Sequence, residues 1–304
     1  MGTRWSVSLD ADAALNLTAL RRDLAAAVAQ VDEQMSPWKP NSDLMRLNRA
    51  PVDTWVGLHT EIMEVLDCAF DICRLSAGAF DPGVGTLVDA WGFGAVRDAP
   101  DAVAIRSARQ PASRPTHERL ELDRPAGRAR KRAPLQLDLC GIAKGYAVDQ
   151  MAAVLQPHGV RHALVALDGE LRAVGSQANG VPWAVALERP EIGHRAVHGV
   201  IELENVSVAT SGDYRHSLNV GGARLAHSMD ARRAAPVNNA VASVTVLANS
   251  CIQADAWATA LLVAGPGEGL ALAQRMGLDA LWLLHRAEGL VELGLGRFGS
   301  PRAP

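Results

Sequence analysis

Aromatic side chains and excess basic charge are both scarce in this chain. Only 4% of its 304 residues are aromatic, and the formal net charge at pH 7 is -3. A nucleic-acid-binding protein needs a basic surface and rings on which bases stack, so we expect no nucleic acid as a partner. A small anionic ligand held by a metal ion fits this composition better.

Cysteines are few, and long apolar runs are missing. Cys68, Cys73, Cys140 and Cys251 show no Cys-x-x-Cys spacing, which favours reduced or buried thiols over a disulfide scaffold. No apolar stretch reaches the roughly 18 residues of a membrane span, and no basic and apolar leader opens the chain. We therefore expect a soluble, cytoplasmic protein without a transmembrane segment. The alternative is a periplasmic protein whose leader is missing from the sequence.

The hydrophobic periodicity predicts a mixture of helices and strands. Helical spacing covers residues 17–34, 43–47, 60–78 and 143–155, and continues around 255 and 268–276. Strand patterns cover residues 3–9, 162–167, 170–174, 183–187, 197–203, 207–211, 243–247 and 281–285. Because strands and helices come in separate runs, the pattern predicts an α+β fold rather than a doubly wound sheet.

We expect residues 1–304 to form a single domain with a surface excursion over residues 95–132. Residues 95–118 are polar and contain prolines, as in a linker. The basic segment 124–132 is predicted to form an exposed hairpin rather than a nucleic-acid-binding arm.

Two acidic segments carry most of the chemical information. In Ala254-Asp255-Ala-Trp-Ala-Thr259, a helix would place the carboxylate and the hydroxyl on one face, and such oxygen donors suit a hard cation. In Asp138-Leu-Cys-Gly-Ile-Ala-Lys-Gly-Tyr-Ala-Val-Asp149, bare backbone at Gly141 can approach an anion, and Lys144 can meet its charge. Together they predict a magnesium and phosphate site. The alternatives are a helix-cap role for Asp255 and a hydroxyl of Thr259 bonded to its own helical turn.

Ordered sequence blocks along nearly the whole chain carry a family resemblance. The blocks are Met1-Gly-Thr3, Met35-Ser-Pro-Trp38 with Ser42-Asp-Leu44 and Asn48, Ala79-Phe-Asp-Pro82, Trp91-Gly-Phe-Gly94, Asp138 to Asp149, Ser211-Gly-Asp213, His227-Ser-Met-Asp230, and Ser243-Val-Thr-Val246 with Ala254-Asp255 and Thr259. In this order they resemble ApbE-type FAD:protein FMN transferases. The resemblance implies an α+β, T-fold-related architecture of mixed sheets and packed helices, with the cofactor site in a cleft between the halves. It also implies that FAD and Mg²⁺ bind, that FMN moves to a threonine of an acceptor flavoprotein, and that AMP is released.

The resemblance also implies roles for individual residues. Those expected to bind FAD are Met1, Trp38, Ala79, Phe80, Asp81, Asp138, Lys144 and Met229. Those expected to bind the metal are Gly141 (through its carbonyl), Asp255 and Thr259. His227 is the candidate general base for the acceptor hydroxyl, because the unperturbed pKa of histidine lies near working pH. A homodimer is one expectation for the assembly.

Some of these residues have simpler interpretations. Trp38 would also serve as the hydrophobic anchor of its loop, and Asp81 would also cap a turn before Pro82. His227 would also orient the site without accepting a proton, and Asp213 is another candidate partner in it.

Two blocks depart from the family pattern. Asp168-Gly169 stands where the family usually has Gly-Gly, and Asp230 leads into Ala-Arg-Arg-Ala-Ala-Pro236 rather than Pro-x-Thr-Gly. The first change is expected to weaken FAD binding, and the second leaves the turn geometry open. They keep two other hypotheses in view: an FAD pyrophosphatase that releases FMN and AMP, and a non-catalytic FAD-binding protein.

The C-terminal Gly294-Leu-Gly-Arg-Phe-Gly299 matches a dinucleotide-binding pattern by chance. Too few residues follow it for the helix and returning strand that such a site needs. We expect a terminal turn there.

Overall fold

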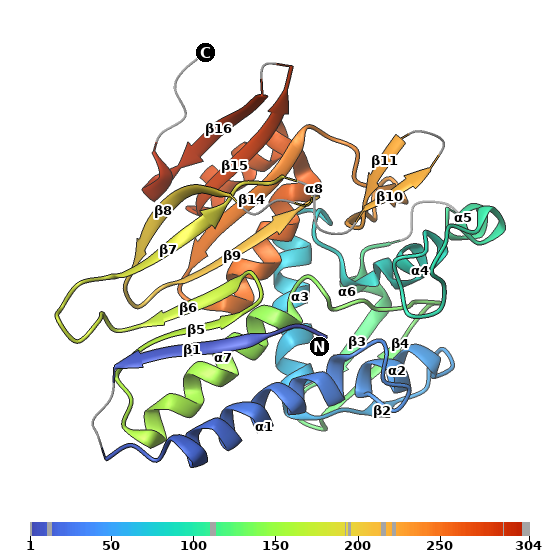
Figure 1. The fold of residues 1–304 in the computed structure, drawn as a ribbon. Coiled ribbons are helices and arrows are strands. Elements are labelled where there is room, and N and C mark those ends of the chain that lie inside the picture. The colour runs from blue at the N-terminus through green and yellow to red at the C-terminus, as the bar shows by residue number, and fades with distance from the viewer. Residues whose placement is uncertain are drawn as a thin grey trace.

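The fold is built on one large antiparallel sheet. The computed structural model describes residues 2–10, 14–109, 114–191, 193, 196–213, 217–220, 223–287 and 289–299. The sheet has seven strands in the order β1-β5-β6-β9-β14-β15-β16 (Figure 1). Their bounds are β1 Trp5–Asp10, β5 His162–Leu167, β6 Glu170–Val174, β9 Ser207–Gly212, β14 Val241–Ala248, β15 Asp279–Arg286 and β16 Gly289–Leu295. The prediction of an α+β fold is confirmed.

Both faces of the sheet are covered, as the alternation along β15 illustrates. Ala280, Trp282 and Leu284 belong to the main core, which also contains buried residues of the helices α1, α3, α7 and α8. Leu281 and Leu283 point the other way and pack with Leu187 of a separate hairpin, because successive strand side chains face opposite sides. The helices are α1 Leu17–Met35, α3 Thr60–Leu75, α7 Ala143–Leu155 and α8 Cys251–Met276, and the hairpin strands are β7 Trp183–Glu188 and β8 Val197–Leu203.

Helix α8 runs through the core. By length and composition it is the one helix of the described chain that would be able to cross a membrane, but 61% of its most apolar window is buried in the fold. The sequence predicted two helices here. This is confirmed, because α8 consists of two helical segments on either side of Gly265, whose φ of 75° and ψ of 179° are non-helical and which Pro266 follows.

A second region beside the sheet holds short elements (Figure 1). They are α2 Asp43–Arg49, β2 Val56–Gly57, η1 Pro82–Val84, α4 Gly85–Ala90, α5 Ala102–Ala108, α6 Thr116–Arg119, β3 Leu120–Asp123 and β4 Arg128–Lys131. The hairpin predicted over residues 124–132 is present in part: β3–β4 spans residues 120–131, and Leu120 and Ala129 are buried in the core rather than exposed. Its Arg128 and Arg130 pair with Asp123 and Glu121 and also cover Trp55, so these two arginines are engaged within the fold.

Several elements were not foreseen from the sequence. Besides β2, η1 and the short helices of residues 85–119, they are η2 Gln156–His158, β10 Ser217–Val220, β11 Ala223–Ala226, β12 Met229–Asp230, β13 Ala235–Pro236 and η3 Gly296–Phe298. The expectation of a terminal turn over residues 294–299 was wrong at its start, because Gly294 and Leu295 end strand β16, which pairs with β15.

Candidate functional site

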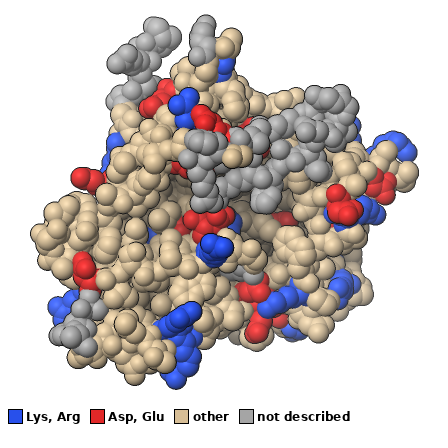
Figure 2. Space-filling view, in the orientation of Figure 1, with Lys and Arg blue, Asp and Glu red and all other residues tan. Residues whose placement is uncertain are grey.

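One cavity gathers the residues singled out from the sequence. Its volume is about 980 Å³, at the upper end of the range for small-molecule sites. The predicted site residues that line it are Trp38, Ala79, Phe80, Asp81, Asp138, Gly141, Lys144, His227, Met229, Asp255 and Thr259. Met1 lies outside the described residues. Figure 2 shows a hollow near the middle of this face with acidic atoms gathered beside it.

Helices α7 and α8 form one wall of the cavity and run antiparallel. The carboxylate of Asp149 accepts hydrogen bonds from the N–H groups of Cys251 and Ile252, each at 2.9 Å. One turn along, the N–H of Gly145 donates to Asp255 Oδ2 at 2.9 Å. The two acidic segments are therefore held side by side, with Asp255 fixed against the first turn of α7.

Glycines make this close approach fit. A methyl group added at Gly145 would lie 2.2 Å from the carbonyl oxygen of Cys251, and one at Gly141 would lie 2.9 Å from Thr259 Oγ1. Real side chains do not approach so closely, so both positions require the absence of a side chain. At Gly141 this leaves the main chain next to the hydroxyl of Thr259.

The donors at this wall fit a hard cation. The carboxylate of Asp255, the hydroxyl of Thr259 and the main-chain carbonyl of Gly141 are all oxygen donors. In the described chain, Asp255 receives one side-chain hydrogen bond, at Oδ2, which leaves Oδ1 for a ligand. No cluster of three or more His, Cys, Asp or Glu side chains suited to a metal occurs among the described residues. A single carboxylate with neutral oxygens suits Mg²⁺, which keeps water or phosphate for its remaining positions.

A buried ion pair lies beside the predicted metal donors. Lys144 Nζ lies 2.5 Å from Glu170 Oε1, and the Glu170 side chain is only 2% exposed. Burial raises the pKa of Glu170 to about 7 against the opposing charge of Lys144. Burial alone would lower the pKa of Lys144, but Glu170 and Asp255 outweigh it and hold that pKa above its ordinary value. Glu170 Oε2 is buried without a hydrogen-bond partner, so this oxygen is left to accept from a ligand or water.

Burial also shifts the pKa values of the Asp138 and Asp255 carboxyl groups. Burial raises the pKa of Asp255, and the nearby Lys144 opposes the rise. Burial likewise raises the pKa of Asp138, whose Oδ1 accepts from the N–H of Cys140 at 2.7 Å. A nearby cation would favour the charged form of both groups.

Other residues of the cavity lining offer apolar and aromatic surface. Trp38 is 62% exposed at its rim, whereas Phe80 and Met229 are buried in its wall. His227 packs edge-on against Phe93, with ring centroids 6.4 Å apart. Such surfaces suit a flat heteroaromatic ring.

Asp81 uses its carboxylate within the protein. Oδ1 accepts from the N–H of Gly83 at 2.7 Å and from the Thr116 hydroxyl, and Oδ2 accepts from the Thr116 N–H at 3.1 Å. This agrees with the turn-capping interpretation. A contact of Asp81 with FAD stays a prediction, as do the roles of the other residues of the cavity.

The first departure from the family pattern occupies a tight turn. Asp168 lies in the β5–β6 turn with φ of 55° and lines the cavity. Aspartate is one of the few residues other than glycine that tolerate this left-handed conformation. The turn is therefore kept, and a carboxylate is added to the cavity.

Some residues of this site were missed by reasoning from the sequence. Glu170 appeared only as the first residue of a strand, and its burial depends on the packing of β6 against α7. Ser211, whose hydroxyl lies 3.1 Å from Thr259 Oγ1, was noted only as part of a motif. A buried carboxylate paired with Lys144 would have identified Glu170 as a site residue, but this pairing is visible only once the tertiary structure is known.

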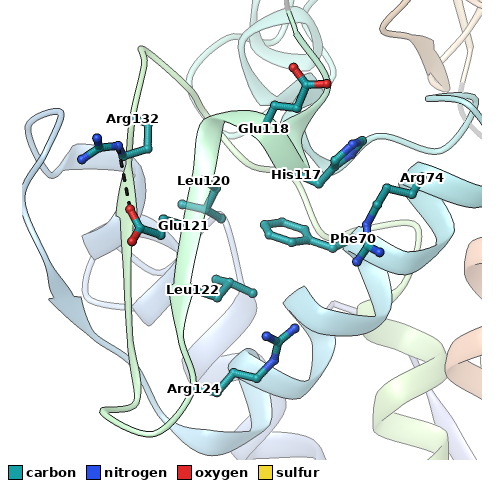
Figure 3. A pocket seen from close by; sticks show the side chains of 9 residues that line it. All are labelled: Phe70, Arg74, His117, Glu118, Leu120, Glu121, Leu122, Arg124 and Arg132. Atoms are coloured by element: carbon teal, nitrogen blue, oxygen red, sulfur yellow. Dashed lines mark ion pairs between the residues drawn. The ribbon is translucent and has the colours of Figure 1, made fainter.

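A second cavity, of about 480 Å³, shares no lining residue with this site (Figure 3). It is lined by Phe70, Arg74, His117, Glu118, Leu120, Glu121, Leu122, Arg124 and Arg132. Its arginines are neutralised by Asp71, Asp67 and Asp53 at 2.8, 2.6 and 2.8 Å. It therefore lacks the free positive charge that an anion site needs.

Curated relatives cover nearly the whole chain. An FAD:protein FMN transferase of Vibrio cholerae serotype O1 is 33% identical over 303 residues, which are 98% of this chain and 89% of the relative. An FAD:protein FMN transferase of Haemophilus influenzae is 33% identical over 301 residues, which are 96% of this chain and 86% of the relative.

Solved structures and a family model agree. The flavin transferase ApbE from Vibrio cholerae superposes with a TM-score of 0.87 at 32% identity, over 98% of this chain and 95% of that one. The apo form of the Pseudomonas stutzeri flavinyl transferase ApbE gives 0.85 at 33% identity, over 98% and 93%. The model of the ApbE family matches residues 1–282. This chain therefore belongs to the ApbE family.

Proposed function

We propose that this chain is an FAD:protein FMN transferase. It would bind FAD with Mg²⁺ in the cavity of about 980 Å³, transfer FMN to a threonine hydroxyl of an acceptor flavoprotein, and release AMP. The names of the relatives support flavin transfer from FAD. The observation that carries the proposal is the α7–α8 wall, where Asp255, Thr259 and Gly141 adjoin Lys144 inside one cavity.

The chain's own residues fit the steps of this reaction. Lys144 offers a positive charge to the diphosphate, and Trp38, Phe80 and Met229 offer a wall to the flavin ring. His227 is the candidate to take the proton from the acceptor hydroxyl, whose oxygen then attacks the phosphorus on the FMN side. The bond between that phosphorus and the bridging oxygen breaks, and AMP leaves with the bridging oxygen.

Asp255, Thr259 and the carbonyl of Gly141 would hold the magnesium ion. When bound, such an ion neutralises charge on the bridging and leaving oxygens. Gly141 and Gly145 allow the main chain and the two helices to approach closely enough for this.

One incubation tests the proposal. The chain is mixed with FAD, MgCl₂ and an FMN-binding acceptor domain carrying a threonine, and the acceptor is weighed by mass spectrometry. A gain of one FMN less one water supports transfer, and it should vanish when the acceptor threonine is replaced by valine. Free FMN and AMP with an unchanged acceptor would instead indicate a pyrophosphatase. Unchanged FAD would indicate a binding protein.

A further inference from the structure

Arg232 joins the turn after β12 to helix α8. Its backbone N–H and its Nε donate to Asp230 Oδ1 at 2.9 and 3.2 Å, and Nη2 lies 3.4 Å from Asp230 Oδ2. On its other side, Nη1 donates to Glu268 Oε1 at 2.5 Å. A planar guanidinium can serve two carboxylates at once in this way.

The segments that Arg232 connects all reach the cavity. Met229 of β12 lines it, as does His227 just before that strand, and α8 supplies Asp255. The stem of Arg232 also packs over Gly78, where an added methyl group would lie 3.7 Å from its Cγ. Gly78 leads directly into Ala79 and Phe80, which are cavity residues as well.

The local backbone gives this turn little support of its own. Strands β12 and β13 pair only as Met229 with Pro236 and Asp230 with Ala235. Pro236 has no N–H to donate. Two further backbone bonds support the turn: the Val237 N–H donates to the Ser228 carbonyl at 2.8 Å, and the Arg233 N–H donates to the Asp230 carbonyl at 3.2 Å. A ladder this short needs side-chain contacts to fix its place.

Arg232 is more buried than its neighbour Arg233. The Asp230 side chain is 4% exposed and that of Arg232 30%, so their contact is shielded from water. Arg233 is 75% exposed and lies 3.6 Å from Asp230 Oδ2, and a solvated contact of this kind contributes little. The two adjacent arginines therefore form a matched pair, in which Arg232 bonds to two carboxylates and Arg233 is mostly exposed to solvent.

We infer that Arg232 is a positioning residue for the transfer step. By pairing with Asp230 and Glu268 it ties His227 and Met229 to the part of α8 after Gly265, and through that helix to Asp255 in the part before it. This inference rests on the proposed function, because it concerns the alignment of the acceptor side of the cavity with the metal and phosphate side. Arg232 itself does not line the cavity.

The test compares Arg232→Ala, Arg232→Lys and Arg233→Ala with the wild type. Flavin transfer to the acceptor gives kcat, quenching of FAD fluorescence gives Kd, and thermal unfolding reports folding. Arg232→Ala should lower kcat by roughly 10- to 100-fold, since misplacement by about 1 Å is enough for such a loss. The Kd for FAD should change far less than kcat, because Arg232 itself does not line the cavity and the variant leaves Trp38, Lys144 and Asp255 in place.

The companion variants sharpen the test. Arg232→Lys should recover part of kcat, since a lysine reaches one carboxylate but not both. Arg233→Ala should stay within about twofold of wild type. If Arg232→Ala does not fold, Glu268→Gln removes the link to α8 while Asp230 stays paired, and it should lower kcat in the same way.

Three outcomes would overturn the inference. If the wild type transfers FMN and the Arg232 and Glu268 variants have the same kcat, the positioning role of Arg232 is refuted while the proposed function stands. A loss of kcat that only follows the loss of folded protein or of FAD binding would also refute it. A wild type that transfers no FMN would refute the proposed function and this inference together.

Discussion

Asp255→Asn should separate metal binding from folding. The carboxylate is 3% exposed, and its Oδ2 accepts one hydrogen bond from the Gly145 N–H at 2.9 Å. An asparagine oxygen can accept the same bond. Because burial raises the pKa of Asp255, the charged form is costly without a cation, and a neutral amide removes that cost. The metal-free variant should therefore be at least as stable as the wild type.

The expected size of the metal-dependent rise in Tm follows from the linkage between ligand binding and folding. A ligand at about 100 times its Kd stabilises the folded state by about 2.7 kcal/mol. In a protein of this size class 1 kcal/mol shifts Tm by roughly 2 °C, so saturating MgCl₂ with FAD should raise the wild-type Tm by about 5 °C. Asp255→Asn should lose most of that rise. Its affinity for the metal should fall by at least ~100-fold, because even residues behind the direct ligands are worth 10- to 100-fold.

Differential scanning fluorimetry with and without MgCl₂ and FAD measures the rise in Tm, and the transfer assay measures activity in parallel. Asp89→Asn is the control, since burial also raises the pKa of Asp89 and its side chain does not line the cavity. That variant should keep both the rise and the activity. The metal assignment would be refuted if Asp255→Asn kept a Mg²⁺-dependent rise in Tm and full turnover.

Three further changes test other parts of the site. His227→Ala should lower kcat by about 10²- to 10⁴-fold with little change in the Kd for FAD, and a pH-independent residual rate would support its role as the base. Trp38→Ala should weaken FAD binding by about tenfold, whereas Trp38→Phe should not, as fluorescence titration can show. Because the pKa of Glu170 is raised to about 7, the folded state holds a proton on Glu170 at pH values where the unfolded chain has released it. The contribution of Glu170 to the free energy of unfolding therefore falls as pH rises from about 5 to about 7. In EDTA, the Tm of wild type should therefore drop more between pH 5 and pH 8 than that of Glu170→Gln; equal drops would contradict this.

The sequence predicted elements well where the alternation or helical spacing was strong. The predicted strands 162–167 and 170–174 and the predicted helix 143–155 coincide with β5, β6 and α7. Strand β16 was missed because none of its residues is fully buried, so no buried face marks it. Only its pairing with β15 makes it a strand. Helices and strands with a buried face can thus be predicted from the local sequence pattern, whereas an edge strand such as β16 is recognised only from its pairing with the neighbouring strand.

The site was predicted in part, for a related reason. The motif chemistry of Asp138, Lys144 and Asp255 indicated one anion and cation site, and the structure joins these residues in one cavity. Glu170 and Arg232 carried no such pattern. Their importance depends on buried partners on other elements, and that information lies in the packing rather than in any local stretch of chain.

The charge around the cavity explains why a cation matters beyond any single ligand. The carboxylates that line it are Asp32, Asp81, Asp138, Asp168, Glu170, Glu188 and Asp255, and Lys144 is the one lysine or arginine of the described lining. FAD would add the negative charge of its diphosphate. Like charges ~4 Å apart repel by about 4 kcal/mol at the effective dielectric constant near a protein surface. Hydrogen bonds to Asp81 and the pairing of Glu170 with Lys144 reduce this repulsion only in part. A divalent ion at Asp255 would reverse the field that the diphosphate meets. Losing that ion should therefore weaken FAD binding even where every contact to the flavin ring is intact.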